Sequence, residues 1–169
     1  MAGKSHQEVV PALFTERLCK TTTKNCTGFL QSRTYKGAAG APAAGLYAYE
    51  YRIDLRNALG VVAISCIDSM TINFGPMVGT LNYGGSAKPD QVFVVTGGGL
   101  GTIGLASAIR TGSRIKFNFT APICEGGAPG KGNSSFFWGL VSTKPPKAVT
   151  ATLHESGGVN HSVNARAPG

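Results

Sequence analysis

A glycine motif in the middle of the chain has the spacing that dinucleotide-binding proteins use for their cofactor. The GxGxxG pattern runs from Gly99 to Gly104 and follows the apolar segment QVFVVT at residues 91–96. In a dinucleotide-binding fold, such glycines let a helix N-terminus approach a pyrophosphate. Here the helix would have to fit into residues 103–110, and the first acidic residue after the next strand is Glu125. We therefore predict a glycine-rich loop between strands, with positive φ at several glycines and no cofactor.

Other residue types that perform catalysis or bind metals do not fall into a productive spacing. Residues 126–132 share the composition of a phosphate-binding loop, but Glu125 stands in place of its first glycine and Gly132 in place of its hydroxyl residue. His154 and His161 lie too far apart for the HExxH pattern of zinc proteases. A Ser–His–Asp triad is assembled only in three dimensions, and nothing in the sequence singles one out. We expect a protein that is not an enzyme, without catalytic, cofactor or metal sites.

The four cysteines favour disulfide bonds over a metal site. No two of them have the CxxC spacing, and none has a histidine near it in the sequence. Of the three possible connectivities, we predict Cys19–Cys26 together with Cys66–Cys124. Disulfides indicate an oxidising, extracellular or cell-surface location, whereas four free thiols would be the cytosolic alternative. Because the first residues contain no apolar stretch, we expect that a leader has been removed.

Two groups of aromatic residues are candidates for a ligand platform or an interface. The first group alternates along one predicted strand, and the second is consecutive, so at least one of its rings points away from the core. Planar rings can stack on sugars, and exposed aromatics also serve in assembly interfaces. Burial of all the rings between two sheets is the structural alternative. The residues are Tyr47, Tyr49, Tyr51, Phe136, Phe137 and Trp138, of which Trp138 is the best candidate for a stacking platform.

The charge of the chain is basic but dispersed. Sixteen Lys and Arg residues stand against eight Asp and Glu residues, which gives a net charge of +8, while charged residues make up only 14% of the chain. The basic residues are scattered singly, whereas segments that neutralise nucleic acid usually cluster their charge. A solvated basic surface is one interpretation, and an acidic partner such as a polyanionic glycan or an anionic cell surface is the other. No apolar run approaches the roughly 20 residues of a membrane-spanning helix.

Alternating apolar and polar residues predict strands through most of the chain. The clearest alternation covers residues 46–56, where the tyrosines face one side and charged residues the other. Glycine, proline and asparagine separate the strands, as turns require. We predict an all-β fold, an antiparallel β-sandwich or jelly-roll-like arrangement of about seven or eight strands. The predicted strands lie at residues 46–56, 61–67, 70–74, 91–96 (as a buried strand), 114–119, 136–142, 149–154 and, as an edge strand, 163–166.

The first part of the chain lacks a clean period. Residues 37–45 consist of Gly, Ala and Pro, which is typical of a flexible linker. We therefore predict two regions, an irregular N-terminal arm with its linker at residues 1–45 and a sandwich domain at residues 46–169.

These features favour a non-catalytic extracellular structural protein. We expect the subunit of a self-assembling filament, sheath or coat, a homo-oligomer or polymer in which the N-terminal arm contacts a neighbouring subunit. The alternative is a secreted recognition module that binds a glycan or an anionic surface polymer through exposed aromatics and basic residues. A coat that packages nucleic acid is a variant of the first hypothesis, and it would show steep salt dependence of binding.

Overall fold

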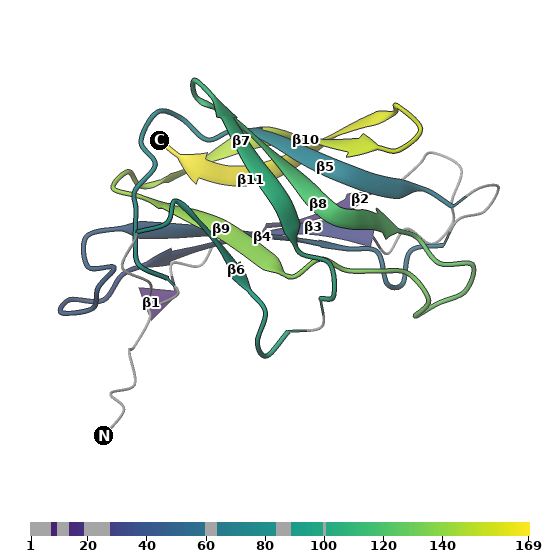
Figure 1. The fold of residues 1–169 in the computed structure, drawn as a ribbon, viewed down its shortest axis with the longest axis horizontal. Coiled ribbons are helices and arrows are strands. Elements are labelled where there is room, and N and C mark those ends of the chain that lie inside the picture. Colours follow the sequence, from purple (N-terminus) through teal and green to yellow (C-terminus); the bar gives the residue numbers. More distant parts are fainter. Residues whose placement is uncertain (1–7, 10–13, 19–27, 60–63, 84–88, 100) are drawn as a thin grey trace.

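The computed structural model shows an all-β protein, and the predicted fold class is confirmed. It describes residues 8–9, 14–18, 28–59, 64–83, 89–99 and 101–169, in which all regular elements are strands. Two antiparallel sheets lie face to face as a β-sandwich (Figure 1).

One sheet has six strands in the order β1-β3-β4-β9-β6, and β2 also pairs with β3. Both N-terminal strands add to the same edge of β3, at successive places along it. The bounds are β1 Glu8–Val9, β2 Phe14–Leu18, β3 Gly28–Lys36, β4 Tyr47–Asp54, β6 Val92–Val95 and β9 Phe137–Ser142.

The other sheet has five strands in the order β11-β10-β5-β8-β7. Figure 1 shows it above the six-stranded sheet, with β7 and β6 at the front. The bounds are β5 Cys66–Asn73, β7 Leu105–Thr111, β8 Arg114–Cys124, β10 Pro146–Glu155 and β11 Asn160–Pro168.

The alternation of side chains explains why these segments form half-buried strands. On β4, Tyr49, Tyr51 and Ile53 point into the core with no exposed surface. On β8, Ile115 and Phe117 are likewise buried. Because successive side chains of a strand point to opposite faces, the charged residues between them lie on the outer faces of the sandwich.

An aromatic cluster joins the two sheets in the core. The Trp138 ring of β9 lies 5.9 Å from the ring of Phe117 and 5.1 Å from that of Phe119, both on β8. Tyr51 of β4 completes the cluster, with ring centroids 6.1 Å from Trp138 and 6.3 Å from Phe117. Tilted and edge-on contacts of this kind add about 0.5–1.5 kcal/mol per pair beyond the burial of apolar area.

Tyrosine hydroxyls also connect the core to the backbone. The Tyr51 hydroxyl donates to the Arg166 carbonyl of β11 at 2.6 Å, and the Arg166 amide donates to the Ser32 Oγ of β3 at 3.1 Å. The Tyr49 hydroxyl donates to the Lys144 carbonyl at 2.6 Å. Burial raises the pKa of both tyrosines, with neighbouring tyrosines adding to it, so they remain neutral donors. These bonds satisfy polar groups whose burial without partners is costly.

The predicted arm needs correction between residues 28 and 45. Residues 28–36 form β3, an integral strand whose Leu30, Ser32 and Thr34 are buried. Two of these inward side chains are polar, so the segment lacks the alternation of apolar and polar residues from which strands were predicted. Residues 37–46 connect β3 to its antiparallel neighbour β4, so this Gly/Ala segment is a hairpin connection and not a linker between domains.

The strand predictions also change in the middle of the chain. The separately predicted strands at residues 61–67 and 70–74 give way to the single strand β5, and residues 60–63 lie outside the described residues. Strand β7 was not predicted, because it is exposed along almost its whole length and lacks an apolar face. Residues 91–96 were predicted to be a buried strand, but β6 leaves Val94 and Val95 36% and 39% exposed at a sheet edge.

The glycine motif is a loop, as predicted, and β7 begins where the helix of a dinucleotide site would lie. We expected positive φ at several glycines of this stretch. Among its described residues, only Gly98 has a positive φ, 72°. Gly101 is needed for another reason. A Cβ there would lie 2.0 Å from the Ser135 carbonyl oxygen, so the loop packs directly against the backbone.

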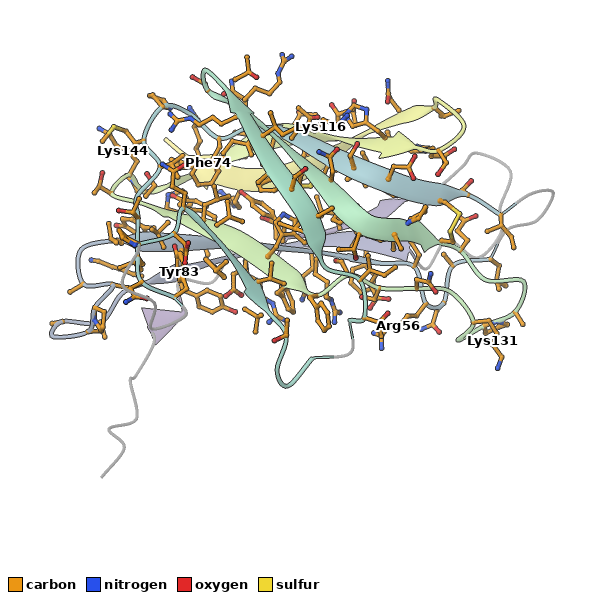
Figure 2. All side chains as sticks on the ribbon, viewed as in Figure 1. Arg56, Phe74, Tyr83, Lys116, Lys131 and Lys144 are labelled. Carbon is orange, nitrogen blue, oxygen red and sulfur yellow. A yellow bond between two sulfur atoms is a disulfide. The ribbon has the colours of Figure 1, made fainter. Side chains whose placement is uncertain are left out.

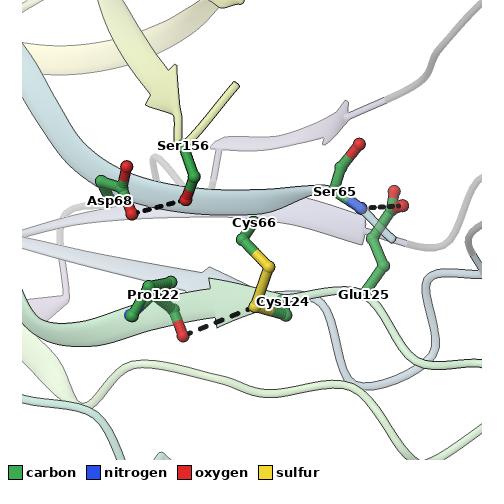
Figure 3. Close-up of a disulfide and its surroundings, with 7 residues drawn as sticks. All are labelled: Ser65, Cys66, Asp68, Pro122, Cys124, Glu125 and Ser156. Atoms are coloured by element: carbon green, nitrogen blue, oxygen red, sulfur yellow. Dashed lines mark hydrogen bonds between the residues drawn. A yellow bond between two sulfur atoms is a disulfide. The ribbon is translucent and has the colours of Figure 1, made fainter. Parts of the chain in front are cut away.

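A disulfide links the central strand β5 of the five-stranded sheet to its neighbour β8, and the predicted Cys66–Cys124 pairing is confirmed. The two residues are directly opposite on β5 and β8, with 4.0 Å between their Cα atoms (Figure 3). Glu125 accepts a hydrogen bond from the Ser65 amide beside the bridge. Cys19 and Cys26 lie outside the described residues.

Removing the Cys66–Cys124 bridge tests its contribution to stability. The bridge closes a loop with a sequence separation of 58 residues. We expect Cys66→Ser combined with Cys124→Ser to lower the free energy of unfolding by roughly 2–4 kcal/mol, because the unfolded chain regains conformational freedom. Urea unfolding measures the loss, and the control is the same comparison under a reducing agent, where the wild type also lacks the bridge and the difference should disappear. Equal stability of the Cys66/Cys124 variant and the wild type would contradict the expectation.

Candidate functional site

A polar groove lies on the outer face of the five-stranded sheet. It has a volume of about 810 Å³ and is lined by residues of β5, β7, β8 and β10 and of the β7–β8 turn. Half of the lining residues carry hydroxyl groups. These are Thr71, Thr111, Ser113, Thr150 and Thr152.

The strand register sets these side chains in rows across the groove. Thr152 lies opposite Thr71, Thr71 opposite Lys116, and Lys116 opposite Ile109. Residues directly opposite each other point to the same face, and neighbouring strands are about 4.8 Å apart. The groove floor is therefore a regular array of polar side chains, with the basic ones on β8.

A histidine at one end of the groove joins two polar neighbours. The Thr71 hydroxyl lies 2.8 Å from His154 Nε2, and His154 Nδ1 lies 2.6 Å from the Asn160 side-chain oxygen. Because that oxygen only accepts, Nδ1–H donates to it, and in the tautomer whose proton is on Nδ1 the Thr71 hydroxyl donates to Nε2.

This hydroxyl–imidazole–amide order resembles that of a catalytic triad, but Thr71 lies within a paired strand and not beside free backbone donors. Thr71 sits in the middle of β5, which pairs with β10 on one side and β8 on the other, so its strand backbone donors serve the sheet ladder. A triad needs donors directed at the oxygen that becomes negative. We interpret the arrangement as a hydrogen-bond network that orients Thr71.

Three of the predicted aromatic residues lie in the core. Trp138 is 1% exposed, and Tyr49 and Tyr51 have no exposed surface. A stacking platform must present a ring face to solvent, and these three rings do not. They lie between the two sheets, which is the structural alternative given above.

The other three aromatic candidates are partly buried. Arginine side chains cover the Phe137 ring, with the Arg33 guanidinium 4.4 Å and that of Arg52 5.1 Å from its centroid. Tyr47 packs against the edge of the core. Phe136 lies just before β9, and its ring is 3.8 Å from where a Cβ on Gly104 would be.

The acidic residues of β4 are engaged by arginines. Asp54 accepts from Arg56 Nε at 2.9 Å, from the Arg56 amide at 3.1 Å and from Arg52 at 3.1 Å. Burial alone would raise the pKa of Asp54, but these hydrogen bonds and the two positive charges outweigh it and hold the pKa below its usual value. Burial raises the pKa of Glu50, and the charge of Arg33 opposes that shift in part. Asp54 is thus a structural anion.

Two exposed strand edges are the second notable surface feature. Within the described residues, β6 pairs only with β9 and β7 only with β8. At the opposite edge of the five-stranded sheet, the backbone amide and carbonyl of Arg166 on β11 bond to Ser32 and Tyr51 of the other sheet. Exposed large apolar residues on the two open edges include Val94, Val95 and Ile109.

Sequence reasoning missed the groove because its residues come from four strands that are distant in the chain. The local signal was the alternation of hydroxyl residues, as in Thr150 and Thr152. That signal was used to identify strands and not to identify a surface. Arg114 and Lys116 alternate with Ile115 and Phe117, which indicates a strand but does not indicate a shared surface.

The described chain is thus an all-β protein whose two antiparallel sheets form a β-sandwich, with a polar groove on one outer face and two open edges. Comparison of the chain with protein-family models, with curated proteins and with solved structures finds no match. The Cys66–Cys124 bridge is consistent with an extracellular location. Among the described residues, no three or more His, Cys, Asp or Glu side chains converge on a common metal position. That same part of the chain has no helix long and apolar enough to span a membrane.

The role of Asp54 predicts a pH-dependent contribution to stability. Its pKa is lowered in the folded protein, so the stabilisation is complete above the unfolded value of about 3.9 and is lost as the pH falls through the folded value. We expect Asp54→Asn to cost roughly 1–3 kcal/mol at pH 7 and progressively less below about pH 4. Urea unfolding across this pH range measures both, and the exposed Asp90→Asn is the matched control. A cost that stays constant down to pH 2 would refute the assignment.

Proposed function

We propose that the protein is a non-catalytic extracellular structural protein, the subunit of a self-assembling filament, sheath or coat. The observation that carries the proposal is the open edge of β6, whose backbone groups offer a template for a strand from another copy.

The composition of β6 favours pairing over solvent exposure. It reads Val-Phe-Val-Val and contains no charged residue or proline. Edge strands that stay single in solution are usually protected by lysine, proline or a bulge. Val94 and Val95 would bury their exposed apolar surface on pairing, and this burial stabilises the contact.

The two edges of the six-stranded sheet support a head-to-tail contact. The N-terminal strands β1 and β2 lie at one edge, and β6 lies at the other. In the proposed assembly, β6 of one copy pairs with the N-terminal strands of the next. A contact between two different surfaces repeats along an open polymer, whereas a contact of one surface with itself ends at a dimer. In this assembly the N-terminal strands contact a neighbouring subunit, which is the role expected of the N-terminal arm.

Strand β7 offers a second open edge for lateral contacts. Six of its seven residues are exposed, and Arg110 is its only charged residue. At the other edge of this sheet, the Arg166 backbone of β11 already bonds to the six-stranded sheet. We therefore expect β7 to contact a different surface of a neighbour. Lateral contacts of this kind would join filaments into a sheath or coat.

A charge on the β6 edge tests the proposal. Val95 lies opposite Phe137, whose ring is on the outer face, so a lysine at position 95 extends into solvent and leaves the core intact. We expect wild-type protein to form polymers that grow with concentration and Val95→Lys to lose this head-to-tail polymerisation, because the lysine must be desolvated on pairing. Light scattering and electron microscopy measure the assembly, and thermal unfolding confirms the fold.

The matched control is Val159→Lys. Val159 is 46% exposed, as an apolar residue comparable to Val95, but it lies in the turn between β10 and β11. This variant should assemble as the wild type does. Wild-type protein that stays monomeric at high concentration would contradict the proposal. Assembly of Val95→Lys at the wild-type level would contradict it as well.

A further inference from the structure

The groove on the five-stranded sheet is separate from the β6 edge, which belongs to the other sheet. We propose that this groove binds a polyanionic glycan, a chain of hydroxyl-rich sugars that carries sulfate or carboxylate groups. The inference does not depend on the assembly described above.

The size and position of the groove suit a segment of a polymer. Its volume of about 810 Å³ lies in the usual range of ligand sites, roughly 300–1,000 Å³. It crosses β10, β5, β8 and β7 on an outer face of the sandwich, so a chain longer than the groove can continue at either end.

The charge of the groove favours an anionic ligand. Arg114 and Lys116 are two residues apart on β8, so both side chains point to the same face, and both residues are exposed. The residues that line the groove include no carboxylate. Carboxylates elsewhere on this sheet have other partners, since Asp68 accepts from Ser156 at 2.7 Å and Glu155 lies 2.7 Å from His161.

The hydroxyl rows favour a sugar as the carrier of the negative charge. A threonine hydroxyl both donates and accepts, which matches the hydroxyl groups of a sugar. Thr71 and Thr152 lie opposite each other, and His154 holds the Thr71 hydroxyl at 2.8 Å. Threonine is also restricted at χ1, so less side-chain entropy is lost when the ligand binds.

The lining argues against nucleic acid as the polyanion. Single-stranded nucleic acids bind through several aromatic rings on which successive bases stack, and no Phe, Tyr or Trp lines this groove. The one ring in the lining is the His154 imidazole, which is held by hydrogen bonds to Thr71 and Asn160. The groove's one large apolar residue is Ile109, which is 55% exposed. An aliphatic side chain can cover the C–H face of a sugar but gives a base no ring to stack on.

Titration calorimetry at about 0.15 M salt, where long-range charge effects are screened, tests the proposal. The probes are dextran sulfate, polygalacturonate, uncharged dextran and a single-stranded oligothymidylate. We expect wild-type protein to bind at least one of the charged glycans, and the tighter one identifies the anionic group. Arg114→Gln combined with Lys116→Gln should weaken that binding roughly tenfold, as expected for two exposed charge pairs.

The matched control removes two charges outside the groove. Lys131 and Lys144 lie at opposite ends of the molecule, whereas Lys116 lies on the upper sheet (Figure 2). Lys131→Gln/Lys144→Gln should bind as the wild type does. A second pair, Thr71→Val/Thr152→Val, keeps every charge and should weaken glycan binding several-fold through the lost hydroxyl groups.

Three results would overturn the proposal. They are the absence of binding by both charged glycans, equal affinity of the groove and control charge variants, and oligothymidylate binding as tight as that of the glycans. The titration in the Val95→Lys background should give the wild-type affinity, since position 95 lies on the other sheet. Failure of assembly and failure of glycan binding are thereby distinguished.

Discussion

The contact between the two sheets at Trp138 is the interaction on which the rest of the structure depends. Trp138 and Tyr51 come from one sheet and Phe117 and Phe119 from the other, so the cluster holds together strands that do not pair with each other. The Tyr51 hydroxyl reaches the backbone of β11 and closes the sandwich along that side. A shift of one residue in β4, β8 or β9 would turn these rings outward, so the cluster also specifies the register of the strands.

The same register determines the chemistry of the two outer faces. On β8, burial of Ile115 and Phe117 places Arg114 and Lys116 outside, where the threonines of β5 and β10 complete the groove. On β4, burial of the alternate residues places charged side chains outside, where the Asp54–arginine pairs form. The groove therefore offers cations without carboxylates in its lining, whereas on the other face two arginines pair with Asp54. The groove is the better candidate for an anionic ligand because its cations are not already matched.

The sequence predicted the parts of the fold that have a strong apolar period. Strands β4, β8, β10 and β11 appear where alternation placed them, and the Cys66–Cys124 bridge joins the strands it was expected to join. Strand β3 escaped prediction because Ser32 and Thr34 occupy inward positions. The Ser32 position can be polar because its hydroxyl accepts from the Arg166 amide, a partner that lies far along the chain. A local pattern contains no information about such a partner.

The candidate site depends even more on contacts between residues that are distant in the sequence. Three consecutive aromatic residues guarantee one outward ring, but only the register of β9 against β4 decides that Trp138 is the inward one. The groove depends on four strands whose order in the sheet does not follow their order in the chain. Yet its residue types explain a feature of the composition. Threonine supports a strand through its branched Cβ and remains hydrated through its hydroxyl, so an outer face rich in threonine stays polar with few charges. The low charged fraction of 14% is then compatible with a polar surface, and the few cations on that face are left for a ligand.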